Sequence, residues 1–305
     1  MRDGSNSTPL AFTGNSAGYV DLTGASIDPM AVVALHARAL FALRPLLDAA
    51  NVAGISVAPV KGALTARWLY ASVRERPFSD VDLRVVPEDL EALAAIAARK
   101  GWRVRWRDRV YRSLGVEIEG VTFDIETWIG APWMSSLSVR AALARATRTD
   151  ALLGVEHSRL DVHDHALVLA LNVVKDRVGS TAPWAIEDLA RVASVPEFDA
   201  EKMASVAWRA ANASVLWGVA SWMSRSRAVA GWASVERALG SVSRPRYART
   251  VAALLSAREG AALDRMRRRL CARSASDDVG DRARSLGVMA RWMASPLAWP
   301  VLQRT

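Results

Sequence analysis

The chain has 305 residues, of which 51% are hydrophobic and 23% are charged, and its net charge is +9. This length predicts about two domains, and this composition excludes wholesale disorder. The single cysteine, Cys271, excludes an internal disulfide and a cysteine-based zinc site, and it favours a reducing, cytoplasmic setting. No stretch approaches about 18 uncharged apolar residues, so no membrane span or membrane partner is expected.

The charge is distributed unevenly along the chain. Residues 201–305 carry 18 Lys and Arg against 7 Asp and Glu, a net charge of +11, whereas residues 1–200 carry −2. A basic C-terminal half favours an anionic partner such as nucleotide phosphates or nucleic acid. An arginine-rich surface without such a partner explains the same pattern equally well.

The predicted elements begin after a leader, residues 1–27, which is rich in small polar residues, lacks an apolar core and is expected to be flexible. Apolar residues at steps of three and four predict a helix from Asp28 to about Ala50. A run of β-branched residues predicts one strand, and a run in which charged and apolar residues alternate predicts another. The segment after each strand predicts a helix. In chain order these are a strand at 55–60, a helix at 63–70, a strand at 79–86 and a helix from Pro87 to Lys100.

Three strand-like segments follow, at 102–106, 109–118 and 121–128, and residues 28–150 are therefore predicted to form a small α/β domain. After a short extended piece at 155–162, residues 151–305 show no strand pattern. Helical segments are predicted at 163–178, 184–194, 200–226, 245–257 and 260–273. The predicted fold class is α+β, a mixed sheet flanked by helices and followed by an all-α domain.

The most informative side chains are two pairs of carboxylates on predicted strands. Asp80 and Asp82 share one strand face because strand side chains alternate, and Asp124 and Glu126 repeat the pattern on a later strand. Close carboxylates repel each other, and Mg²⁺ is the usual compensation because it prefers oxygen ligands. If the strands are neighbours, Asp124 completes a three-carboxylate cluster that can hold two metals. A lone D-x-D is more often a solvated strand face.

A lysine and a glycine stand between the first predicted strand and the next helix. Gly62 would let the backbone approach a phosphate, and Lys61 would add a positive charge. Arg76, shortly before the first carboxylate pair, could contact the same triphosphate. An ordinary strand-to-helix turn with surface charges explains these residues equally well.

Together these segments resemble a known family. The runs Val60-Lys61-Gly62-Ala63-Leu64, Leu69-Tyr70 and Arg76-Pro77-Phe78-Ser79-Asp80-Val81-Asp82-Leu83 resemble the uncharacterised nucleotidyltransferase branch of the polymerase-β superfamily. The run Val121-Thr122-Phe123-Asp124-Ile125-Glu126-Thr127-Trp128 resembles its third-carboxylate strand, and Trp184 with Asp188-Leu189 resembles a later helix. The resemblance covers roughly residues 30–195 and implies a minimal nucleotidyltransferase fold.

The resemblance also implies roles for individual residues. Asp80 and Asp82 would be metal ligands and Asp124 the third, catalytic carboxylate. Gly62 would be the glycine at the nucleotide phosphates. Beside it, Lys61, Arg76 and Ser79 are the other residues expected to bind the nucleotide. Three positions depart from the family pattern: Ala63 replaces a small hydroxyl residue, Arg84 replaces an aliphatic residue, and Glu126 stands where this branch often has histidine. The last departure leaves open a third-strand assignment shifted by two residues.

Other candidates have simpler explanations. The histidines of Glu156–His165 could ligate a metal but are more typical of a polar turn before a helix. The basic run Arg265–Arg269 could grip a nucleic-acid backbone but is more typical of a solvated helix face. The tryptophans, for instance Trp208, Trp217 and Trp222, could stack on bases, but their apolar neighbours favour core packing.

The sequence therefore predicts a Mg²⁺-dependent, two-metal enzyme that moves a nucleoside monophosphate from an NTP such as ATP to a hydroxyl-type acceptor and releases pyrophosphate. The acceptor, whether a small molecule, a peptide or a tRNA, is left open. An alternative is an inactive protein of the same fold that binds nucleic acid or another polyanion, through the basic C-terminal half. A toxin-like enzyme that modifies tRNA ends or a protein hydroxyl would share the active site.

Overall fold

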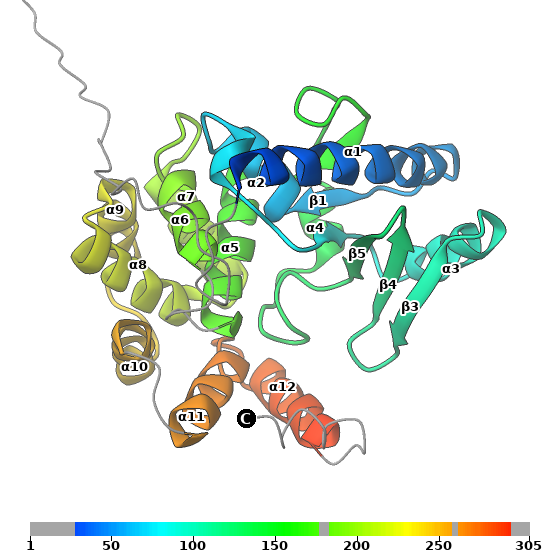
Figure 1. The fold of residues 1–305 in the computed structure, drawn as a ribbon. Coiled ribbons are helices and arrows are strands. Elements are labelled where there is room, and N and C mark those ends of the chain that lie inside the picture. Colours follow the sequence, from blue (N-terminus) through cyan, green and yellow to red (C-terminus); the bar gives the residue numbers. More distant parts are fainter. Residues whose placement is uncertain (1–27, 177–182, 258–261, 294–305) are drawn as a thin grey trace, which may run out of the picture.

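The computed structural model describes residues 28–176, 183–257 and 262–293. A mixed sheet and its covering helices form one side of the molecule, and the helices that follow residue 160 form the other (Figure 1). This arrangement confirms the predicted α+β class. The leader at residues 1–27 lies outside the described residues.

Helix α1 (Pro29–Val52) begins where the sequence places it. The Asp28 side chain accepts a hydrogen bond from the Met30 backbone N–H, and Pro29 occupies the first turn, where its missing N–H costs nothing. Leu43, Leu46 and Leu47 are almost fully buried in the same core as the sheet residues. By length and composition α1 is the one helix of the described chain that could cross a membrane, a test that a core helix also passes.

Five strands form the main sheet, in the order β1-β2-β5-β4-β3. Strand β2 pairs parallel with β5, and the other neighbours pair antiparallel. Their bounds are β1 (Ala58–Val60), β2 (Val81–Arg84), β3 (Arg103–Asp108), β4 (Ser113–Ile118) and β5 (Val121–Glu126). The central pair, β2 and β5, consists of the two strands that carry the predicted carboxylates.

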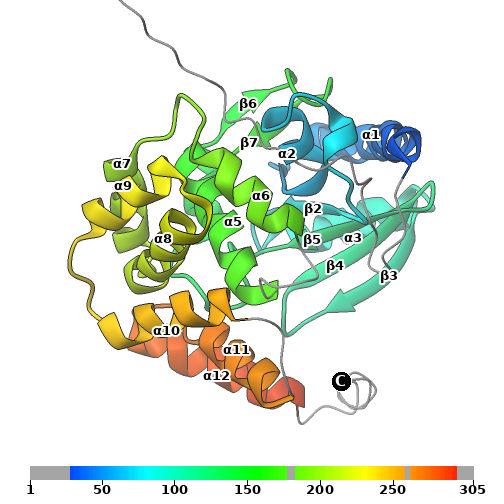
Figure 2. The same cartoon turned by 60° about the vertical axis from the view of Figure 1, so that its left-hand side comes forward.

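The two faces of this sheet have different chemistry because side chains alternate along each strand. Val81, Leu83, Phe123 and Ile125 point into a core shared with α1 and α3 (Asp89–Arg99). The opposite face carries the charged residues of β2 and β5 and is directed toward α5 (Val162–Asp176), whose Lys175 acts electrostatically on it. Figure 2 shows α5 and α6 beside β2 and β5. The polar sheet face therefore meets the helical half.

The remaining elements connect the sheet to the helices and build the second half. They are α2 (Gly62–Trp68), η1 (Val73–Glu75), α4 (Val139–Leu143), β6 (Thr147–Thr149), β7 (His157–Arg159), α6 (Pro183–Val192), α7 (Ala200–Arg209), α8 (Ala213–Arg227), α9 (Ala230–Leu239), α10 (Pro245–Ser256), α11 (Ala262–Arg273) and α12 (Val279–Met293). Strands β6 and β7 pair with each other, and the Ser158 N–H donates to Val57 O. The domain boundary near residue 150 therefore falls inside a hairpin, and it stays a prediction.

The structure corrects one predicted helix. The segment 200–226 is two helices, α7 and α8, because Ala211 adopts a left-handed conformation with φ of 53° between them. The buried Asn212 side chain fixes the break by donating to Met134 O and Ala275 O. Helices α9 and α12 were not predicted. Trp232 of α9 is fully buried and donates its indole N–H to Leu189 O.

Candidate functional site

The central strands bring two of the three predicted carboxylates together at the polar sheet face. Asp82 of β2 and Asp124 of β5 are direct register partners in the parallel pair, and Arg84 and Glu126 are the next pair on the same face. Asp80 lies two residues before Asp82, just outside the strand, where its carboxylate accepts a hydrogen bond from Ser79 Oγ at 3.0 Å. The structure thus places Asp82 and Asp124 side by side.

Nearby positive charges stabilise the ionised form of Asp82 more than that of Asp124. Burial by itself would raise the pKa of Asp82, but the charges of Lys61 and Arg84 outweigh it and hold that pKa below its usual value. The pKa of Asp124 is raised to about 7, first by burial and then by the negative charges of Glu126 and Asp82. Asp124 is therefore both desolvated and close to two other carboxylates.

Lys61 and Gly62 form the turn between β1 and α2. Lys61 Nζ lies 2.6 Å from Asp82 Oδ1. Its backbone has φ of 56° and ψ of −161°, a conformation that strains a residue with a side chain and that is typical of functional sites. Gly62 has φ of 26°, and a Cβ at this position would lie 3.2 Å from Phe78 Cβ and 3.4 Å from Asp80 O. Glycine is therefore needed both for the conformation and for close contact with the segment that precedes Asp80.

Arg84 and Glu126, two of the departures from the family pattern, form their own ion pair. Arg84 Nη2 lies 2.6 Å from Glu126 Oε2, and the Arg84 side chain is 2% exposed. This pair explains why Glu126 can occupy a half-buried strand position beside Asp124. The glutamate is neutralised locally by an arginine that the aliphatic residue of the family pattern could not supply.

Arg76, one of the expected nucleotide-binding residues, forms an ion pair with the helical half. Its guanidinium is buried against Asp188 of α6, with Nε 2.9 Å from Oδ1 and Nη2 2.8 Å from Oδ2. Asp188 also accepts hydrogen bonds from Tyr70 Oη at 2.8 Å and Thr65 Oγ1 at 3.2 Å. Asp188 thus ties α2 and the segment before β2 to the helical half. Sequence reasoning placed Asp188 within the resemblance but gave it no role.

The other sequence candidates have structural explanations. His163 accepts from the Asp199 backbone N–H and contacts Asp161, at the start of α5, which fits the turn interpretation. Trp222 is buried and fits core packing, whereas Trp208 is 47% exposed, contrary to the prediction. Arg268 of the basic run is 6% exposed and donates to Ala257 O, so its side chain is not on a solvated face.

The oxygen donors at the sheet face fit a hard divalent cation in their chemistry. Asp80, Asp82 and Asp124 supply only carboxylate oxygens, and burial together with the nearby Glu126 and Asp82 raises the pKa of Asp124, which a bound cation would lower. Within the described residues, no three or more His, Cys, Asp or Glu side chains are already grouped as a metal cluster. The Asp82 carboxylate instead forms an ion pair with the Lys61 ammonium group.

A comparison with protein families decides the family. The model of a family described as "Uncharacterised nucleotidyltransferase" matches residues 30–222, more than half of the chain. The chain belongs to this family. The match confirms the resemblance seen in the sequence and supports a general role in nucleotidyl transfer. No curated protein matches the chain. The matched region extends from α1 into α8, so this nucleotidyltransferase unit includes the sheet and the first helices of the second half.

Proposed function

We propose that the protein transfers a nucleoside monophosphate from an NTP to a hydroxyl-type acceptor with the help of Mg²⁺. The observation that supports this most directly is the register pairing of Asp82 with Asp124 beside the strained Lys61–Gly62 turn. Family membership supports the reaction class. The proposal adds three points to this reaction class: the use of Mg²⁺, the type of acceptor and the roles of the individual site residues.

Each residue of the site has a proposed task. Asp80, Asp82 and Asp124 would hold Mg²⁺, which when bound neutralises phosphate charge and polarises the reacting phosphoryl group. Gly62 allows the triphosphate close to the backbone, and Lys61 exchanges its present partner, Asp82, for the phosphates. Ser79 positions Asp80 through its hydrogen bond.

The reaction forms one bond and breaks one. The acceptor oxygen bonds to the α-phosphorus, and the bond from that phosphorus to the bridging oxygen of the β-phosphate breaks. The bridging oxygen leaves with pyrophosphate and keeps the electron pair. The acceptor proton passes to the Asp124 carboxylate, the proposed proton acceptor at this face. Arg76 is assigned a positioning role, because Asp188 engages its guanidinium.

One observation favours a second candidate function. Lys61 already neutralises Asp82, as it would in a protein of this fold that has lost metal-dependent activity. Such a protein would bind nucleic acid or another polyanion through its basic surface, and its affinity would fall steeply with salt.

The test is label transfer from each α-labelled NTP, with Mg²⁺ and a cell extract as the acceptor source. Asp82→Asn should lower transfer by about a hundredfold or more, the scale of losing one charge-stabilising group at a reaction centre. Asp48→Asn, a matched change on an exposed part of α1, should leave transfer unchanged. Removing Mg²⁺ with EDTA should abolish it. Unchanged transfer by Asp82→Asn would refute the site, and salt-dependent RNA binding without any transfer would favour the second candidate.

A further inference from the structure

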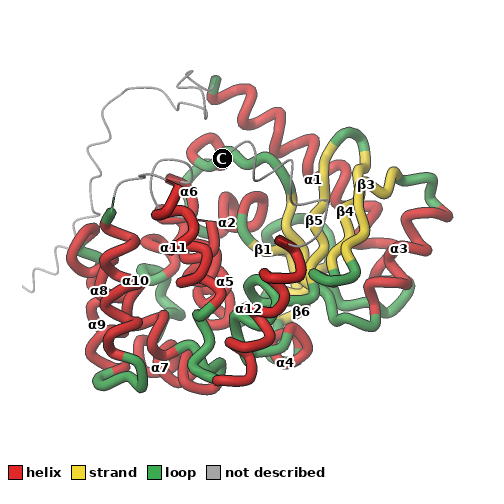
Figure 3. Tube along the Cα trace, turned by 90° about the horizontal axis from the view of Figure 1, so that it is seen from below, coloured by secondary structure: helices red, strands yellow, loops and turns green. Residues whose placement is uncertain are grey.

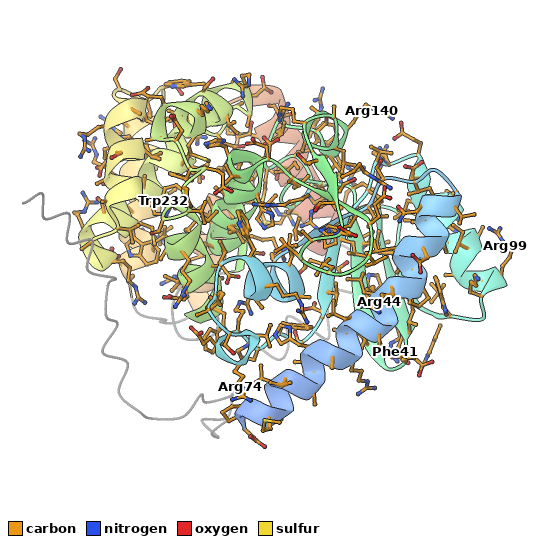
Figure 4. The ribbon with its side chains drawn as sticks, turned by 90° about the horizontal axis from the view of Figure 1, so that it is seen from above. Phe41, Arg44, Arg74, Arg99, Arg140 and Trp232 are labelled. Atoms are coloured by element: carbon orange, nitrogen blue, oxygen red, sulfur yellow. The ribbon has the colours of Figure 1, made fainter. Side chains whose placement is uncertain are left out.

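A concave pocket of about 580 Å³ lies at the far end of the polar sheet face. It is bounded by residues that follow the parallel strands, by the loop before α4 and by the start of α12. Its lining includes Trp128, Trp133 and Arg112, and on its rim Arg140, which Figure 4 shows at the outer surface. Figure 3 shows α12 running past the sheet side of the helical half. A pocket of this size suits a small molecule or one end of a larger one.

The two indoles form the most distinctive wall of this pocket. Their centroids are 5.0 Å apart and their planes are inclined at 55°. Trp128 is fixed by donating its indole N–H to Tyr111 O at 2.8 Å, and Trp133 is held beneath the Arg284 guanidinium at 4.8 Å. Trp133 also has a left-handed backbone, with φ of 63°. Two immobilised indole rings beside an open volume are suited to contacting a flat aromatic ring.

The position of the pocket relates it to the reaction. Trp128 lies two residues beyond the end of β5, where it forms an isolated bridge with Ser138, about 13 Å of extended chain beyond Asp124. Val60 is level with Asp82 in the antiparallel β1–β2 pair, which places the Lys61–Gly62 turn at the opposite end of β2. The carboxylates therefore lie between the phosphate turn and the tryptophans.

Because phosphoryl transfer is in-line, the order of phosphate turn, carboxylates and tryptophans indicates where the acceptor binds. The attacking and leaving oxygens stand on opposite sides of the α-phosphorus. If pyrophosphate leaves toward Lys61 and Gly62, the acceptor must approach from the end of β5 where Trp128 lies. This step rests on the proposed function.

Charges around the pocket narrow the class of acceptor. Three carboxylates also line the pocket, Glu88, Asp278 and Asp281, of which Glu88 pairs with Arg140 and Asp281 pairs with Arg284. Arg112 is exposed, and no ion-pair partner for its guanidinium is found in the described part of the chain. It also lines a neighbouring pocket of about 360 Å³ together with Arg109 and with Arg107, which pairs with Glu91. Arginines beside an aromatic wall match a base that is linked to a phosphate.

We propose that this pocket is the acceptor site and that it binds a nucleotide unit, with its base against Trp128 and Trp133 and its phosphate near Arg112. The unit can come from a free mononucleotide or from the end of a single-stranded RNA. In either case a ribose hydroxyl is the group that attacks the NTP.

Binding measured by calorimetry in EDTA and without NTP separates this proposal from the transfer reaction. The probes are AMP, CMP, GMP and UMP, and a six-residue single-stranded RNA. Trp133→Ala should weaken binding of the probes about tenfold or more, Trp133→Phe should restore most of it, and Trp208→Ala, which removes an exposed tryptophan elsewhere, should change nothing. Lys61→Ala is a control for binding of the probes at the NTP site. In this variant the probes should still bind, and Trp133→Ala should still weaken their binding.

The binding data distinguish a free mononucleotide from an RNA end as the source of the nucleotide unit. A free nucleotide is indicated when mononucleotides bind as tightly as the RNA. An RNA end is indicated when the RNA binds more tightly and Arg109→Gln and Arg112→Gln weaken it in a salt-dependent way. Equal binding by the native protein and Trp133→Ala, or no binding of any probe, overturns the acceptor site even if NTP transfer is observed. Loss of transfer in Asp82→Asn with Trp133-dependent binding intact supports both proposals.

Discussion

The buried Arg76–Asp188 ion pair joins the sheet half to the helical half, and the loss of stability on breaking it can be predicted. The two side chains are 9% and 1% exposed, and Asp188 accepts hydrogen bonds from three different residues. Asp188→Asn removes the charge that Arg76 needs while it leaves the side-chain volume nearly unchanged. Breaking a buried pair by removing one partner costs about 3–5 kcal/mol, because the other charge remains buried. We expect a loss of about 3 kcal/mol in the free energy of unfolding.

The measurement is urea unfolding followed by circular dichroism at 222 nm, for the native protein, Asp188→Asn, Arg76→Met and the double variant. The double variant should lose clearly less than the sum of the single losses, because no unpaired charge remains in it. Glu187→Gln, which removes the neighbouring and partly exposed ion pair with Arg191, should cost only about 0.3–0.5 kcal/mol. A loss below about 1 kcal/mol in Asp188→Asn, or additive losses in the double variant, would refute the reasoning.

Two further predictions concern the helical half. Burial lowers the pKa of His165 to about 3, and both of its ring nitrogens lack a hydrogen-bond partner among the described residues. The unfolded chain then binds a proton that the folded chain does not between about pH 6.5 and pH 3, so stability falls as the pH drops through this window, by about 2 kcal/mol at pH 5. Urea unfolding at pH 7 and pH 5 should show this extra loss in the native protein and not in His165→Leu; equal losses would contradict it. In α8, Gly218→Ala should destabilise by about 1–3 kcal/mol, because its Cβ would lie 2.5 Å from Ala248 O. Gly287→Ala in α12 meets no atom within 4 Å and should stabilise by up to about 1 kcal/mol. Thermal melts that move both variants in the same direction would contradict the packing argument.

Local patterns were enough for the approximate positions of the strands and for the identity of their polar residues. The alternation around Asp82 and Asp124 already placed each carboxylate on the face opposite to its hydrophobic neighbours, because strand geometry has a period of two. The Lys61–Gly62 turn was visible for a similar reason, since glycine between a strand and a helix marks a special backbone conformation. The break at Ala211 was not visible, because no glycine or proline marks it and the conformation is imposed by the distant partners of Asn212.

Pairing between distant segments was decided only by the tertiary structure. The sequence by itself determined which residues could form strands, helices and a carboxylate face, because these depend on neighbours a few positions away. It did not determine that β2 lies beside β5, that Lys61 reaches Asp82, or that Arg76 pairs with Asp188. Such contacts depend on how whole faces pack, and a buried charge takes the partner that packing brings within reach.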